Sequence, residues 1–109
     1  MALAAARVSM PEQARRGEIV NVKALMRHPM ETGYRVDDMG RPIERHIVER
    51  FRVTYGGDEV FAIDLTQGVA ANPFFAFYLR ADESGPVVFT WEDDRGEVTT
   101  VTRELTVTA

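Results

Sequence analysis

The chain has 109 residues, of which 45% are hydrophobic and 28% are charged, and its formal net charge is −4. This length supports one domain with one hydrophobic core, and the composition is that of an ordinary globular protein. The acidic balance argues against a nucleic-acid partner and against an anionic membrane surface. No apolar run approaches the roughly 20 residues of a membrane span. Cysteine is absent, which excludes a disulfide, a thiolate metal site and a thiol nucleophile within the chain.

The first 16 residues are expected to form a flexible arm or an edge strand, followed by a single domain at 17–109. Val8 is the first residue with strand character, and Pro11 limits hydrogen bonding to a neighbouring strand. The apolar segment at 2–6 is shorter than the roughly 7–15 residue core of a signal peptide and has no basic segment before it. The residues alone therefore indicate a soluble protein made in the cytoplasm, without a cleavable signal.

Alternating apolar and polar residues predict a strand over 18–26. Two further alternating segments, 47–55 and 60–65, are joined by Gly56-Gly57 and Asp58, which is typical of a β-hairpin. A last hairpin is predicted between 87–92 and 97–107, across a turn rich in aspartate and glycine. Together with the segment described next, these patterns predict an all-β fold, an immunoglobulin-like antiparallel β-sandwich of about seven strands.

The most hydrophobic segment is FFAFYLRA, at 74–81. Its apolar residues fall on both sides of the predicted strand, so we expect both faces to be covered, one by the core and the other by a second element. An apolar outer face on a small domain indicates a protein interface. The candidate interface residues are Phe74, Phe75, Phe77 and Tyr78. Periodicity alone equally allows a central strand beneath a long loop.

A long polar connection, 27–48, contains both histidines of the chain, His28 and His46. If it folds back as a hairpin around the DDMG turn at 37–40, the two imidazoles converge, and Met26, Met30 and Met39 supply soft sulfur ligands for copper. The alternative to a metal site is a pair of ordinary loop histidines. Both histidines are preceded by arginine, and the spacing matches no established metal motif, so no metal is predicted.

Catalysis within this chain is not expected. The carboxylates that could act as an acid–base pair lie in predicted turns, where solvent keeps their pKa values ordinary; they are Glu31, Asp37, Asp38, Asp93 and Asp94. Neither serine has the surroundings of an activated nucleophile. No catalytic residue and no cofactor is therefore predicted.

Four separated motifs resemble the SoxZ family: HPMETGYRVDDMG at 28–40, YGGDEVFAIDL at 55–65, ANPFFAFYLRADESG at 71–85 and FTWEDDRGE at 89–97. They occur in the order that the family has, and the resemblance extends from Arg7 to Val107. The chain differs at Glu44, where the family often has a proline after the isoleucine, which affects only the local turn.

The resemblance implies a non-catalytic subunit of a sulfur-carrier complex of thiosulfate oxidation. In this family the partner, SoxY, bears a cysteine near a mobile, glycine-rich C-terminus, and sulfur intermediates remain attached to that thiol while pathway enzymes act on them. It further implies a heterodimer or a higher oligomer in the periplasm, exported with a SoxY-like partner that carries the signal.

The resemblance also implies that the polar connection is a docking loop near the partner's cysteine arm, with transient contacts to pathway enzymes. The candidate residues of this loop are His28, Glu31, Arg35 and His46. The alternative is a stand-alone metal-binding or adhesion sandwich of periplasmic type. The metal-binding form requires His28 and His46 to hold copper or zinc together.

Overall fold

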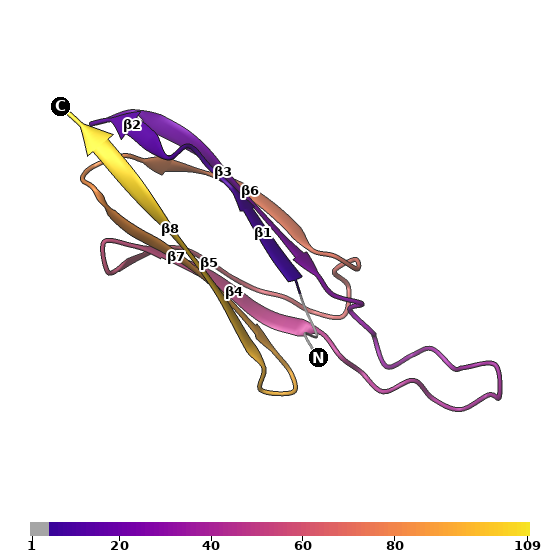
Figure 1. Ribbon diagram of the computed structural model, residues 1–109. Coiled ribbons are helices and arrows are strands. Elements are labelled where there is room, and N and C mark those ends of the chain that lie inside the picture. The colour runs from indigo at the N-terminus through magenta and orange to yellow at the C-terminus, as the bar shows by residue number, and fades with distance from the viewer. Residues whose placement is uncertain (1–4) are drawn as a thin grey trace.

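The computed structural model describes residues 5–109, with the side chains of 6–109, and shows two packed β-sheets (Figure 1). The eight strands in this range are β1 (Ala5–Ser9), β2 (Gln13–Arg15), β3 (Ile19–Arg27), β4 (Val48–Tyr55), β5 (Asp58–Asp64), β6 (Phe74–Arg80), β7 (Gly85–Asp93) and β8 (Val98–Thr108). The predicted β-sandwich is confirmed. The sequence predicted about seven strands and not eight, because the short β1 and β2 carry little alternation of apolar and polar residues. No helix in the described range is long and apolar enough to cross a membrane.

The strands divide into a three-stranded sheet, in the order β1-β3-β6, and a five-stranded sheet, in the order β2-β8-β7-β4-β5. All pairs are antiparallel except β2 with β8, which are parallel. The β4–β5 hairpin turns at Gly56 and Gly57, whose φ angles of 59° and 88° suit glycine. Segment 1–16 was expected to be an arm or an edge strand. In its described part, β1 lies at the edge of the three-stranded sheet and β2 at the edge of the five-stranded sheet. Residues 1–4 lie outside the described range.

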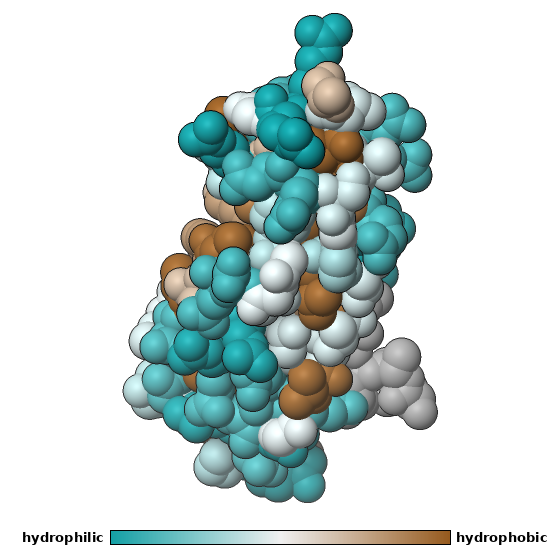
Figure 2. Space-filling model, turned by 90° about the vertical axis from the view of Figure 1, so that its left-hand side faces the viewer, coloured by the Kyte–Doolittle hydropathy of each residue, from teal (hydrophilic) through white to brown (hydrophobic). Residues whose placement is uncertain are grey.

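The core lies between the two sheets. In β3 every second residue is buried, as the alternation at 18–26 predicts, and β4 and β7 contribute the largest buried side chains, Phe51, Phe89 and Trp91. Figure 2 shows a largely hydrophilic face of the molecule, on which hydrophobic residues form separate small groups. Burial of one face of each sheet is therefore the main source of stability.

Strand β6 is an edge strand, and its aromatic residues point in two directions. Phe75 and Phe77 point inward: the ring of Phe75 stacks on Phe51 at 5.0 Å between centroids, and that of Phe77 on Phe61 at 4.7 Å. Phe74 and Tyr78 point outward and are 56% and 75% exposed. The expectation that both faces of this strand are covered was wrong for the chain by itself, because its outer face has no covering element among the described residues.

Candidate docking site at the loop end of the sandwich

The connection between β3 and β4 projects beyond the sheets at the end of the molecule opposite the C-terminus (Figure 1). It folds back on itself, as predicted. Near its base Glu31 and His46 exchange two backbone hydrogen bonds of 2.7 and 2.9 Å, and near its tip Val36 pairs with Pro42. This arm contributes to the elongated shape of the molecule, whose longest dimension is 61 Å.

His28 lies at the base of the arm and is buried, with 3% of its surface exposed. Its backbone N–H donates to Asn72 Oδ1 at 2.9 Å, and its carbonyl accepts from the Asn72 N–H at 2.8 Å. Asn72 has a φ of 54°, a conformation that asparagine adopts more readily than most residues. The loop before β6 is thereby fixed to the arm. The alternative of an ordinary polar loop histidine does not hold for His28, because its side chain is buried.

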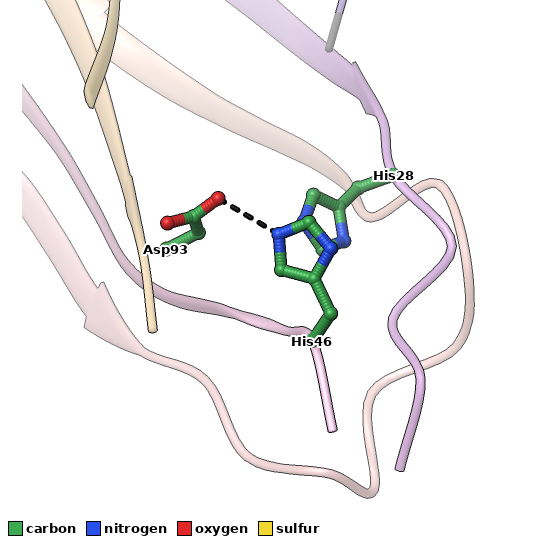
Figure 3. Close-up of side chains that lie close together, drawn as sticks. All are labelled: His28, His46 and Asp93. Carbon is green, nitrogen blue, oxygen red and sulfur yellow. Dashed lines mark hydrogen bonds and ion pairs between the residues drawn. The ribbon is translucent and has the colours of Figure 1, made fainter. Parts of the chain in front are cut away.

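The imidazole of His28 has a defined orientation. Its Nδ1 accepts a hydrogen bond from the Met30 N–H at 3.0 Å, so this nitrogen is unprotonated and the neutral ring carries its proton on Nε2. The ring of His46 packs edge-on against it, with centroids 4.4 Å apart (Figure 3). The two histidines therefore converge, as the hairpin expectation required.

Asp93, at the end of β7, joins this cluster from the other sheet. Its Oδ2 is 2.9 Å from Nε2 of His46 (Figure 3). Its Oδ1 accepts from the N–H groups of Arg95 and Glu97 at 2.9 and 2.8 Å. One carboxylate thus shapes the β7–β8 turn and holds the arm.

Asp94 provides a second connection between the same two loops. It exchanges hydrogen bonds with the backbone of Ile47, at 3.1 Å through its side chain and 3.0 Å through its N–H. Its other oxygen pairs with Arg45 Nε at 3.0 Å. Three loops that are distant in sequence therefore form one ordered surface at this end of the sandwich.

Burial and neighbouring charges shift the pKa values in this cluster. Burial lowers the pKa of His28, and the adjacent His46 lowers it further. Burial would raise the pKa of Asp93, but the hydrogen bonds from His46 and from the Glu97 and Arg95 amides outweigh it, so the pKa is lowered. The folded protein thus favours a neutral His28 beside an ionised Asp93, contrary to the ordinary pKa expected for that aspartate.

The shifted pKa of His28 predicts a pH dependence of stability. Because this pKa is lowered on folding, the stabilisation from neutral His28 is present above the unfolded value of 6.5 and is lost as the pH falls below it. We expect the free energy of unfolding of the wild type to decrease as the pH is lowered from 6.5. His28→Asn keeps an acceptor for the Met30 N–H but does not titrate.

Urea unfolding at a series of pH values measures this effect. The stability difference between the wild type and His28→Asn is expected to shrink as the pH falls. A difference that stays constant from neutral to acidic pH would show that His28 titrates equally in the folded and unfolded states.

The same geometry bears on the metal-site alternative. Potential ligand atoms of His28, His46 and Asp93 lie within 4.8 Å of one another. A metal on Nε2 of His28 needs the proton moved to Nδ1, where it would face the Met30 N–H, and a metal on Nδ1 would displace that hydrogen bond.

The three methionines considered as soft ligands lie in different surroundings. The sulfur of Met30 accepts the Val48 N–H at 3.2 Å. Met26 is buried, and Met39 is 77% exposed on the arm. The sulfur of Met30 is therefore engaged in a hydrogen bond, whereas Nε2 of His28 is buried without a hydrogen-bond partner among the described residues.

The predicted site residues fall into separate groups. His28 and His46 meet in the cluster, whereas Glu31 and Arg35 form an ion pair at 2.8 Å on the exposed arm. The sequence interpretation missed Asn72 as a partner of His28 and treated Asp93 mainly as a turn former. Asn72, directly before Pro73, was the available signal, since this context favours a fixed turn.

Comparisons with known proteins agree with this architecture. A family model described as sulphur oxidation protein SoxZ matches residues 7–104. No curated protein matches the sequence significantly.

Similar solved structures include the sulfur carrier protein SoxY from Chlorobium limicola f thiosulfatophilum, which is 17% identical with a TM-score of 0.67, over 96% of this chain and 80% of that one. A superoxide reductase (neelaredoxin) from Ignicoccus hospitalis is 15% identical with a TM-score of 0.73, over 94% and 80%. A putative superoxide reductase from Thermotoga maritima is 15% identical with a TM-score of 0.66, over 95% and 86%. At these identities the structural similarity shows the fold alone.

Proposed function

The chain belongs to the SoxZ family of sulphur oxidation proteins, and from that premise we propose that it is the non-catalytic subunit of a heterodimeric sulfur carrier. Its partner is a SoxY-like protein whose C-terminal cysteine holds covalent sulfur intermediates during thiosulfate oxidation. A division of labour of this kind is consistent with the absence of cysteine from the chain. The complex works in the periplasm, and the partner carries the export signal for both subunits.

The exposed outer face of β6 is the observation that supports a partner-binding role. Phe74 and Tyr78 stand on this face, and Ile19, on the neighbouring β3, is 59% exposed. Aromatic side chains bury a large area when they enter an interface and are frequent among the residues that contribute most to affinity. Phe75 and Phe77 support the same surface from inside the sandwich.

The loop end has a second role in this proposal. Phe74 directly follows Asn72 and Pro73, so the partner-binding face begins where the base of the arm is anchored. The arm, with Arg35 exposed, Glu31 partly buried beside it, and His28 and His46 holding its base, forms part of the surface on which the partner's cysteine arm is presented to pathway enzymes. Rigid anchoring favours this role because an ordered surface loses little entropy on binding.

Truncating the outward aromatic residues tests the partner-binding role. Phe74→Ala and Tyr78→Ala are each expected to weaken the affinity for the SoxY-like subunit by about tenfold, since each removes aromatic area from the interface. Isothermal titration calorimetry measures the affinity. Val98→Ala is the matched control, because Val98 is 58% exposed on β8, in the other sheet. Equal affinity for all of these variants would contradict the assignment of this face.

A further inference from the structure

The outer face of the three-stranded sheet has an unusual charge distribution for an acidic protein. The chain has 17 acidic and 13 basic residues, yet the described outward positions of β1, β3 and β6 include four basic residues and no acidic one. These positions are Arg7, Ser9, Ile19, Asn21, Lys23, Leu25, Arg27, Phe74, Ala76, Tyr78 and Arg80.

Three of these basic side chains form no ion pair with any other side chain that the structure describes. Arg80 lies 3.4 Å from Asp82. Within residues 6–109, no carboxylate lies within 4.0 Å of the charged groups of Arg7, Lys23 or Arg27. Elsewhere on the molecule Arg35 and Arg41 of the arm and Arg50 of β4 are paired with acids. The positive charge on this face is therefore available to a partner.

A groove of about 240 Å³ lies between these charges, lined by Arg7, Val8, Ser9, Lys23, Leu25 and Phe74. The strand register explains its composition: Arg7 stands opposite Leu25 on one side, and Leu25 stands opposite Phe74 on the other. Ser9 and Lys23 form the next pair along the strands. An apolar floor is thus bordered by two cations and a hydroxyl group.

We propose that this groove receives an acidic and apolar segment of the SoxY-like partner, with a carboxylate between Arg7 and Lys23 and an apolar side chain against Leu25 and Phe74. The inference rests on the proposed function and extends it by naming the chemistry of the contact. Opposite charges accelerate association and fix the orientation of the two subunits. The apolar floor supplies the buried area that charge pairs alone do not.

Charge reversal on the intact chain, titrated with the SoxY-like subunit, tests the proposal. Lys23→Glu is expected to weaken the affinity at least about tenfold at about 50 mM salt, and the loss is expected to shrink at about 500 mM, where screening is strong. Arg52→Glu is the matched control, because Arg52 is an exposed arginine on the outer face of the five-stranded sheet.

The possible outcomes separate the two proposals. If the heterodimer forms but Lys23→Glu binds like Arg52→Glu, the groove is not the contact, although the carrier function stands. If the wild-type chain does not bind the SoxY-like subunit, both proposals fail. Self-association of the isolated chain that Lys23→Glu abolishes, seen by sedimentation velocity, would assign the face to a second copy of the chain and overturn the inference.

Discussion

Phe51→Ala is expected to lower the free energy of unfolding by about 3–5 kcal/mol, the usual cost of removing a buried aromatic side chain. Phe51 is fully buried in β4, and its ring contacts three others: it lies 5.0 Å from Phe75, 4.8 Å from Trp91 and 5.9 Å from Phe61. It therefore connects the five-stranded sheet to the edge strand that carries the proposed interface. Urea unfolding, followed by tryptophan fluorescence, measures the loss.

Such a loss of stability is also expected to affect binding of the SoxY-like subunit, because Phe51 packs against Phe75, and Phe75 supports the backbone from which Phe74 projects. Val98→Ala, on an exposed position, serves as the control and is expected to change stability by less than about 0.5 kcal/mol. If Phe51→Ala lowered the free energy of unfolding no more than this control does, the aromatic contacts of Phe51 would not be what connects the five-stranded sheet to β6.

Asp93→Ala is expected to lower the free energy of unfolding by about 2–3 kcal/mol, because it removes three hydrogen bonds worth about 1 kcal/mol each. Two of these hold the β7–β8 turn through the N–H groups of Arg95 and Glu97, and the third holds His46. Asp93→Asn retains a side-chain oxygen that can accept the turn's N–H groups, so it is expected to lower the free energy of unfolding by less than Asp93→Ala. Asp38→Ala, at an exposed position of the arm, is the control.

The contribution of Asp93 has a defined pH dependence. Since its pKa is lowered on folding, its stabilisation is present above the unfolded value of 3.8 and is lost as the pH falls through the lower folded pKa. The difference between the wild type and Asp93→Ala is therefore expected to narrow in acid. An Asp93→Ala protein as stable as Asp38→Ala at neutral pH would show that the turn and the arm are held by other contacts.

Local patterns predicted the parts of the fold that depend on neighbouring residues. The alternation at 18–26 corresponds to β3 at Ile19–Arg27, and the Gly56-Gly57 signal corresponds to the β4–β5 hairpin. Both succeed because a half-buried strand and a tight turn each impose requirements on adjacent positions.

The contacts that build the loop end could not be predicted in the same way. His28 is anchored by Asn72, 44 residues away, and His46 by Asp93, 47 residues away. Only the packing of the two sheets brings these loops together, so a histidine that looks like part of a polar loop is in fact buried. The two directions of the aromatic residues in β6 likewise depend on distant residues, because Phe75 and Phe77 stack on Phe51 and Phe61 of the other sheet.

We propose that the outer face of β1, β3 and β6 binds the SoxY-like subunit. Hydroxyl-radical footprinting of the chain alone and in the heterodimer measures it directly, because oxidation reports the solvent exposure of individual side chains. We predict that Phe74 and Tyr78 become protected in the heterodimer, while Val60 and Val98, exposed on the other sheet, remain reactive. Protection of Val60 and Val98 with Phe74 and Tyr78 still reactive would contradict the account.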